Sequence, residues 1–321
     1  MNILLYNSGG GLGDCIQLID LITTLKNKFS NSNIWYLGTH KNHFEDKLKD
    51  YNIKLNTLKL DLKYFGFRWN HLFLAKKKFN QIMTEKFDLI IDLQSKFRNT
   101  LILKKIPAKF FYSSTMNFIF CTKKLNFVKT KNNLDNLIKN IEKIVDSEIP
   151  LVAYNIRNIN KVYFEEALKL LPNNNYVGFS VTQGNEYRKK TWPIEKFINV
   201  AIQISKQNKQ PVFFIEKNNQ DLINKISDLV KDALFPETNS TLEGPALVTA
   251  LSTRLSKAIS IDNGVMHMMG LANIPMIVLF GPTNSQKFAP KIDNINILDS
   301  KLIYNSDDIS KIKEEDVLNL I

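Results

Sequence analysis

Cysteine is scarce in this 321-residue chain, which has only Cys15 and Cys121. Two cysteines are too few for a disulfide framework or for a metal site built on thiolates. No pair of acidic residues is placed like a metal site either. We therefore expect a reducing, cytoplasmic setting, no metal and no bound cofactor.

Long apolar runs are also missing. No segment approaches the ~18 consecutive apolar residues that a membrane-spanning helix needs. The opening residues, MNILLYNSGG, lack the basic segment of a secretory signal. The sequence predicts a soluble or peripheral protein.

Acidic residues are rare in one part of the chain. The chain has 43 basic and 31 acidic residues, a formal net charge of +12, and residues 59–131 alone hold 16 basic and 4 acidic residues. The whole positive excess therefore lies in this segment. Aromatic residues stand between its cations, at Phe65, Phe67, Trp69, Phe73, Phe110, Phe111, Phe118, Phe120 and Phe127. This pattern suits an anionic membrane surface or a nucleic acid, or a solvated basic face over core aromatics.

Two rounds of strand and helix alternation indicate two domains of the α/β class. At 321 residues and 44% hydrophobic content the chain can form two cores. The alternation breaks at the polar cluster Pro172–Asn175 and restarts at Tyr176. We predict two Rossmann-like domains, residues 1–172 and 173–321, facing across a cleft.

The first strand, Ile3–Asn7, is followed by a glycine-rich loop and Asp14. Glycines there let the backbone turn sharply and approach a ligand. Apolar residues at helical spacing begin at Ile16, so Asp14 lies at or next to the amino end of a helix. Asp14 either caps this helix or carries chemistry.

A stretch near the carboxyl end predicts an anion site. It reads as a strand ending at Asp262, a turn at Asn263-Gly264, a helix containing His267, and a second strand followed by Gly281-Pro282-Thr283. Both loops then lie at the carboxyl ends of adjacent strands, where open parallel sheets bind ligands. The helix start offers unpaired N–H groups and a positive dipole end. A ligand that carries phosphate is expected.

Three cations precede another helix in this half of the chain. Arg188, Lys189 and Lys190 come just before Trp192-Pro193, and Pro193 suits the first turn of a helix. Cations at the positive end of a helix are unfavourable by themselves. The pattern indicates an anionic partner.

The carboxyl-terminal half contains, in this order, Asp262, Asn263-Gly264, His267, Pro275 and a Phe-Gly-Pro-Thr tetrapeptide that ends at Thr283. This ordered set resembles the signature of the heptosyltransferase family, glycosyltransferase family nine. The resemblance extends to Gly13-Asp14, Asp92-Leu93-Gln94 and Lys190–Pro193. It implies the GT-B architecture, with the acceptor on the amino-terminal domain and the nucleotide sugar on the carboxyl-terminal one.

The same resemblance implies roles for single residues. Asp14 would be the catalytic base of an inverting, metal-independent transfer, most simply of heptose from ADP-heptose to a phosphorylated lipopolysaccharide-core glycolipid. The donor residues would be Thr182, Lys190, Glu216, Asp221, Asp262, Asn263, Gly264, His267, Gly281 and Thr283, with the ribose contact at Glu216 or Asp221. The acceptor residues would be Gly10, Gly11, Gly13, Gln94 and Arg98.

Departures from the family pattern leave other functions open. The chain has Asn7-Ser8 where the family has a basic residue, Asp20 where it has a proline, and Gly270 where it has an alanine. A different donor, such as a UDP- or GDP-sugar, is one alternative. The others are a non-catalytic nucleotide-sugar-binding protein and an RNA-binding protein, although no RNA-binding motif appears and no nucleic acid partner is expected.

Overall fold

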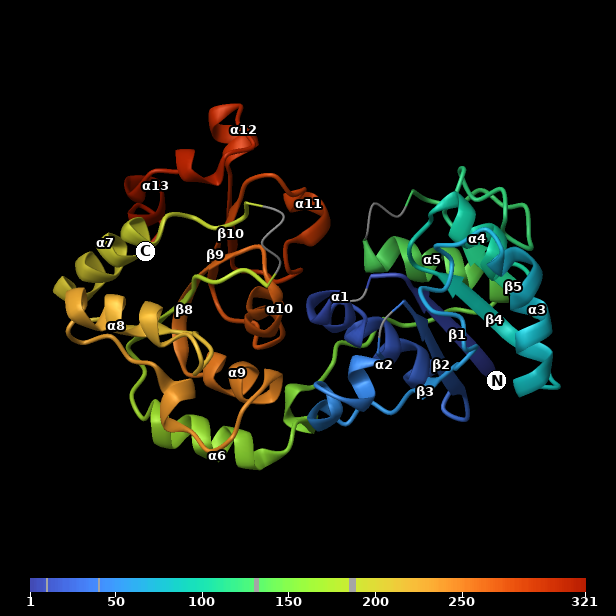
Figure 1. Ribbon diagram of the computed structural model, residues 1–321, viewed down its shortest axis with the longest axis horizontal. Coiled ribbons are helices and arrows are strands. Elements are labelled where there is room, and N and C mark those ends of the chain that lie inside the picture. Colours follow the sequence, from blue (N-terminus) through green and yellow to red (C-terminus); the bar gives the residue numbers. More distant parts are fainter. Residues whose placement is uncertain (10, 40, 130–132, 185–188) are drawn as a thin grey trace. The chain divides into compact units, whose positions relative to one another are not determined.

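The computed structural model describes residues 1–9, 11–39, 41–129, 133–184 and 189–321 (Figure 1). The chain divides into two compact units, Met1–Asn155 and Ile156–Ile321. Each unit contains a five-stranded sheet in which all strand pairs are parallel. The two parallel sheets confirm the predicted α/β class.

The first unit has strand order β3-β2-β1-β4-β5. Its strands are β1 (Asn2–Asn7), β2 (Asn33–Gly38), β3 (Asn56–Thr57), β4 (Phe87–Asp92) and β5 (Ala108–Ser113). Its α-helices are α1 (Leu12–Ile16), α2 (Ile19–Lys28), α3 (His71–Ile82), α4 (Phe97–Leu103) and α5 (Leu134–Val145). The strand order reverses direction between β1 and β4, so the carboxyl ends of these two strands form the switch point at which such sheets bind ligands.

The second unit has strand order β10-β9-β8-β6-β7. Its strands are β6 (Tyr176–Ser180), β7 (Gln210–Phe213), β8 (Leu255–Ile261), β9 (Met276–Phe280) and β10 (Ile295–Asp299). Its α-helices are α6 (Lys161–Leu170), α7 (Ile194–Lys206), α8 (Gln220–Leu229), α9 (Pro245–Ser252), α10 (Gly264–Leu271), α11 (Ser285–Phe288), α12 (Ser300–Tyr304) and α13 (Glu314–Leu318). Its switch point lies between β6 and β8.

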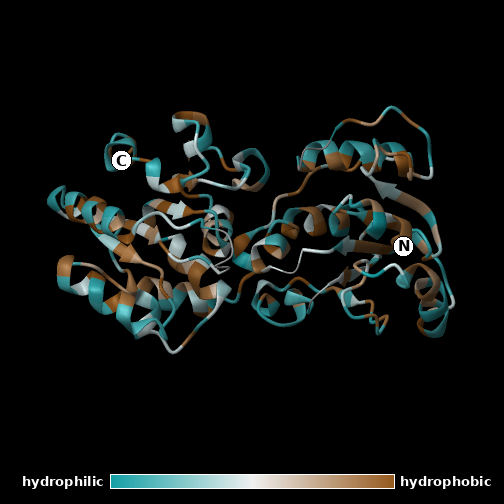
Figure 2. Cartoon of the chain, turned by 45° about the horizontal axis from the view of Figure 1, so that its top comes forward, coloured by the Kyte–Doolittle hydropathy of each residue, from teal (hydrophilic) through white to brown (hydrophobic). Residues whose placement is uncertain are grey.

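Continuous apolar strands form the centre of each unit. Strand β9 is buried at every position and β4 at all but one, which requires cover on both faces of the sheet. In Figure 2 the helices carry alternating hydrophobic and hydrophilic patches, as expected for helices that cover a sheet with one face. In the second unit the rings of Phe179 and Phe213 stack across neighbouring strands with centroids 4.8 Å apart. Such a ring pair adds about 0.5–1.5 kcal/mol beyond its burial.

Several elements differ from the sequence-based expectations. The sequence pattern predicts a strand over Ile53–Leu60 and a helix over Ile309–Leu320. In the structure the first is reduced to β3, and the second is a 3₁₀ turn followed by α13. Strand β10 and helix α12 were not predicted. The units separate before α6, which packs on α9 of the second unit, whereas the sequence interpretation placed the division at residue 172. Among the residues described, no helix is long and apolar enough to cross a membrane.

Candidate active site

Asn263 joins the carboxyl ends of β6 and β8 in the second unit. Its side-chain oxygen accepts a 2.8 Å hydrogen bond from the Met266 backbone N–H and so caps α10. Its side-chain amide donates to the Ser180 hydroxyl at 2.6 Å and to the Thr182 carbonyl at 2.8 Å. The helix start is thereby held at the switch point of the sheet.

Lys190 and Asp262 form an ion pair beside this helix start. The Lys190 ammonium lies 2.6 Å from the Asp262 carboxylate, and the two side chains are 18% and 7% exposed. The Lys190 backbone N–H donates to the side chain of Gln183 at 2.9 Å. Because little water surrounds this ion pair, it is costly to desolvate, and a further charge beside it has a strong effect on it. An arriving phosphate would share an ammonium that is already in position.

His267, in the first turn of α10, is neutral at physiological pH. Burial lowers its pKa to about 4, the Asp262 carboxylate opposes this shift and the Lys190 ammonium adds to it. A neutral imidazole can donate one N–H hydrogen bond and does not compete with Lys190 as a second full charge. The site therefore combines one ammonium with neutral donors.

The loop after β9 brings Gly281 and Thr283 to the same sheet edge. A side chain at Gly281 would place its Cβ 2.8 Å from Cβ of Ile309 and 3.0 Å from the Asp307 carbonyl, so only glycine fits. The Thr283 hydroxyl is buried and finds no hydrogen-bond partner within the described part of the chain. A Cβ at Gly264 would meet no atom within 4 Å, so the backbone at the α10 start faces open space.

Glu216 and Asp221 lie after β7, on the other side of β6. Both are exposed, and Asp221 is in the first turn of α8. The carboxyl group of Glu237 lies close to Glu216: burial, together with repulsion from Glu216, raises the pKa of Glu237 to about 7, and Lys217 opposes this. The sequence analysis missed Glu237, because it stands in an irregular segment without a motif.

Asp14 stands over the glycine loop in the first unit. It lies in the first turn of α1, partly exposed, and its carboxylate accepts a 3.4 Å hydrogen bond from the Gly11 N–H. A Cβ at Gly9 would come within 2.6 Å of this carboxylate, so a side chain there would displace the Asp14 carboxylate. No ion pair of Asp14 is formed among the residues that the structure describes. Gly10 lies outside the described residues.

A chain of hydrogen bonds ties β4 to β1 beside this loop. The Gln94 side-chain amide donates to the side-chain oxygen of Asn7 at 2.6 Å, and the same oxygen accepts from the Gly9 N–H at 3.1 Å. Asp92, which is buried, accepts from the Gln94 N–H at 3.1 Å and from the Ser113 hydroxyl at 2.8 Å. Gln94 is thus fixed in the same network as the loop that carries Asp14.

The structure gathers most of the expected residues into two groups. Within the second unit, Thr182, Lys190, Asp262, Asn263, Gly264 and His267 meet at the β6/β8 switch point, and Gly281 and Thr283 follow the neighbouring strand β9. Within the first unit, Gly11, Gly13 and Gln94 lie around Asp14 at the β1/β4 switch point. Arg98 is engaged elsewhere, since its Nε donates to the Gly66 carbonyl at 3.0 Å and its guanidinium lies over the rings of Phe67 and Trp69.

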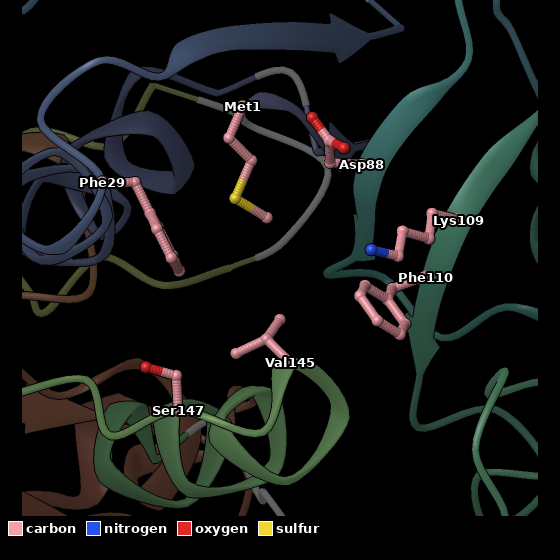
Figure 3. Close-up of a pocket in the computed structure, with 7 residues that line it drawn as sticks. All are labelled: Met1, Phe29, Asp88, Lys109, Phe110, Val145 and Ser147. Carbon is pink, nitrogen blue, oxygen red and sulfur yellow. The ribbon is translucent and has the colours of Figure 1, made fainter.

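A separate hollow of about 410 Å³ lies in the first unit (Figure 3). It is lined by Met1, Phe29, Asp88, Lys109, Phe110, Val145 and Ser147. The Asp88 carboxylate already accepts a 2.7 Å hydrogen bond from the Asn2 N–H. The lining includes the amino-terminal ends of the strands, opposite to the edge at which parallel sheets bind ligands. We therefore assign no substrate to it.

Comparisons with known proteins agree with this geometry. The model of the family described as "Glycosyltransferase family 9 (heptosyltransferase)" matches residues 76–318. A family 9 glycosyl transferase structure from Veillonella parvula is similar, with a TM-score of 0.69 and 20% identity over 99% of this chain and 95% of that one. The structure of the E. coli heptosyltransferase WaaC with ADP is similar with a TM-score of 0.68 and 12% identity, over 99% of this chain and 98% of that one. The structure of the E. coli ADP-heptose heptosyltransferase II has a TM-score of 0.64 and 15% identity, over 100% of this chain and 97% of that one. A search of curated protein sequences found no match.

Proposed function

Since the chain belongs to glycosyltransferase family 9, the heptosyltransferase family, and is a glycosyltransferase, we propose that it transfers heptose from ADP-heptose to a lipopolysaccharide-core or related glycolipid. Support for the donor comes from E. coli WaaC, which has been solved with ADP and with ADP-2-deoxy-2-fluoro heptose. The transfer would be inverting and would use no metal.

The observation that carries the donor site is the hydroxyl of Thr283. It is buried, and within the described residues no group accepts or donates a hydrogen bond to it. Leaving such a group unsatisfied costs about 1–3 kcal/mol. A phosphate oxygen at the end of β9 would accept its hydrogen bond and remove this cost.

The other groups at this edge suit a diphosphate leaving group. As the bond to the sugar breaks, negative charge grows on the departing phosphates. Lys190 would share its ammonium between Asp262 and a phosphate oxygen, and the start of α10 would supply backbone N–H donors. Hydrogen bonds to a charged group contribute roughly 1.5–3 kcal/mol each, and they act most strongly where the charge develops.

Asp14 would act as the general base in the first unit. Asp14 is partly exposed, and its carboxylate accepts a hydrogen bond from the Gly11 N–H of the glycine loop. It would accept the proton from the acceptor hydroxyl as that oxygen attacks the anomeric carbon. One attack from the face opposite to the leaving group inverts the configuration at that carbon. Gln94, beside the same loop, and Arg98 remain proposed acceptor contacts.

The test compares two threonine variants and three nucleotides. Thr283→Val should leave the free energy of unfolding unchanged or raise it, because the lost hydroxyl has no hydrogen-bond partner among the described residues, and should weaken ADP binding by about tenfold or more. Thr253→Val is the matched control, since the Thr253 hydroxyl donates to the Ala250 carbonyl at 2.6 Å. It should lower stability and leave ADP affinity unchanged.

Isothermal titration with ADP, UDP and GDP, next to single-stranded RNA, separates the alternatives. Tightest binding of ADP supports the proposed donor, and tightest binding of UDP or GDP would replace it. Wild-type ADP affinity in Thr283→Val would remove Thr283 from the donor site. Binding of RNA without any nucleotide would overturn the function as a whole.

A further inference from the structure

The segment between β5 and α5 exposes a cluster of large aliphatic side chains. We call residues 114–128 the β5–α5 loop; in Figure 1 it follows β5 beside α4 and α5. Met116 is 60% exposed, Ile119 55%, Leu125 42% and Val128 40%. Met116, Ile119 and Leu125 border one hollow, and a contiguous apolar patch on a protein surface often marks an interaction site.

The loop is held in a fixed and unusual backbone conformation. Met116, Asn117 and Phe118 have φ angles of 48°, 56° and 68°, in the left-handed region that residues with a side chain avoid. The Phe118 ring is buried, 5.0 Å from that of Phe127 and 6.1 Å from that of Tyr112. The buried Phe118 ring anchors the turn, and the side chains of Met116 before it and Ile119 after it remain exposed. The sequence-based expectation that Phe118 and Phe65 could enter a membrane interface is wrong, because both side chains are buried.

The charged residues within the loop and in the sequence on both sides of it are of one sign. No acidic residue stands between Asp92 and Asp135, a stretch that contains nine lysines and arginines. Lys104 on α4 donates to the Phe120 carbonyl at 2.7 Å, and Lys124 donates to the Ile119 carbonyl. Burial, with repulsion from Lys124, lowers the pKa of Lys104. The loop therefore offers concentrated positive charge to an anionic partner.

The exposed side chains decide between the two anionic partners that the sequence allows. Single-stranded nucleic acids bind through bases that stack on aromatic rings. The large apolar side chains that this loop exposes most are aliphatic, while the rings of Phe118 and Phe127 pack against each other and that of Phe120 packs against Phe97. Aliphatic tips beside lysines fit the boundary between lipid headgroups and acyl chains.

We propose that the β5–α5 loop is a membrane-docking element that inserts Met116, Ile119 and Leu125 into an anionic bilayer, with Lys123 and Lys124 against the lipid phosphates. Two arms of the loop, Met116–Ile119 and Lys124–Phe127, line an open hollow of about 470 Å³ that could admit part of a lipid. This inference goes beyond the proposed transfer and does not depend on the donor.

The position of the loop gives docking a consequence for catalysis. Strand β5 pairs with β4, β4 pairs with β1, and all three are parallel. The loop therefore leaves the same edge of the sheet as the segments that carry Asp14 and Gln94. Docking through it would bring the headgroup side of a bilayer to the edge where the acceptor hydroxyl is needed.

Vesicle sedimentation with matched variants tests the proposal. The wild-type protein should sediment with vesicles containing phosphatidylglycerol and not with pure phosphatidylcholine vesicles. Lys123→Glu with Lys124→Glu should lower the partition coefficient at least about tenfold. Lys76→Glu with Lys77→Glu makes the same charge change on α3 and should lower it much less. An equal fall in the partition coefficient of the two double variants would mean that the vesicles attract the positive charge of the protein in general, and would overturn the role of the loop.

A second pair of variants tests whether the exposed aliphatic side chains contribute to binding. Met116→Asp with Ile119→Asp should reduce partition about as strongly as the lysine reversals. Leu168→Asp with Leu302→Asp, at residues 53% and 76% exposed in the second unit, should have no effect. Thermal melting and ADP titration show whether each variant is folded. If the double aspartate variant unfolds, Ile119→Ser replaces it, and an unchanged partition coefficient then overturns the insertion.

A fluorescent reporter measures insertion directly. In a Trp69→Phe background, Ile119→Trp should shift its emission to the blue and be quenched by phosphatidylglycerol vesicles with brominated acyl chains. Vesicle binding without quenching would overturn insertion. Loss of single-stranded RNA binding in the lysine variant, without any vesicle binding by the wild type, would assign the loop to nucleic acid instead.

Discussion

The side-chain amide of Gln94 donates a 2.6 Å hydrogen bond to the side-chain oxygen of Asn7, and this bond ties the carboxyl end of β4 to that of β1. The same oxygen holds the Gly9 N–H at 3.1 Å, at the start of the loop that leads to Asp14. Where the family pattern has a basic residue, this chain uses an amide pair. We propose that Gln94 acts through this bond as a positioning residue, as an alternative to the acceptor contact proposed above.

Gln94→Ala and Asn7→Ala should each reduce kcat by about tenfold, because either change frees the loop that positions Asp14, and a misplaced catalytic group is costly. If the two residues act as one unit, the double variant should be no slower than the single ones. Steady-state kinetics with both substrates measures this. Gln203→Ala, at an exposed site on α7, is the control. A rise in acceptor KM for Gln94→Ala alone would instead make Gln94 an acceptor contact.

Asp14→Asn should reduce kcat by about 100-fold or more, since a general base contributes about 10²–10⁴-fold and an amide cannot accept the proton. Donor affinity should not change, because the proposed donor groups lie in the other unit. Single-turnover kinetics, with ADP titration beside them, separates these effects. Turnover close to that of the wild type would exclude Asp14 as the base.

Lys190→Ala should weaken ADP binding by about 10- to 100-fold, the equivalent of one charge-assisted hydrogen bond. The loss should come with a modest fall in stability, because Asp262 is left buried without its partner. Lys189→Ala is the matched control, since Lys189 is the preceding lysine and is exposed. The same fall in ADP affinity in both variants would mean that only the general charge of this segment matters.

Glu237 should make stability fall as the pH rises from about 4.5 to about 7. The folded protein keeps this proton up to a pKa of about 7, against an ordinary value of 4.5, so the native state binds more protons than the unfolded chain in this window. The stabilisation is fully present below pH 4.5 and is lost above pH 7.

Glu237→Gln, which resembles the protonated acid, should match the wild type at about pH 5 and exceed it in free energy of unfolding at about pH 8. Urea unfolding across this range measures the difference, with the exposed Glu243→Gln as control. Parallel pH profiles for wild type and Glu237→Gln would show that Glu237 is ionised in the folded protein at neutral pH.

The strands that the sequence revealed best are those buried throughout. Runs such as Phe87–Asp92 and Met276–Phe280 are apolar because helices cover both faces of a parallel sheet. Strand β10 escaped detection because it is an edge strand with an exposed centre, so its apolar run is interrupted. In the segment expected as a strand over Ile53–Leu60, alternate residues are buried although only Asn56 and Thr57 pair with β2. The burial pattern of a strand therefore extends over eight residues, whereas the pairing with β2 covers only two.

Motif order indicated which residues lie together at the β6/β8 edge, but not how they interact. The order of Lys190, Asp262 and His267 could be read locally. The ion pair between Lys190 and Asp262, and the approach of Glu237 to Glu216, depend on how distant segments pack. Such contacts leave no local pattern, because each partner alone looks like an ordinary charged residue in a loop.

The parallel topology also sets the order in which the chain can fold. β1 is made first, but it pairs with β2 and β4, and neither partner can join it through a tight hairpin. One edge of β1 therefore stays unpaired until Phe87–Asp92 has been synthesised and a long loop has been closed. Sheets built in this way fold slowly, on the millisecond to second scale, and leave apolar strand edges open meanwhile. A nascent chain that stalls before β4 has emerged would leave the β4-facing edge of β1 unpaired and open to other chains, and binding by a chaperone would protect it best in that interval.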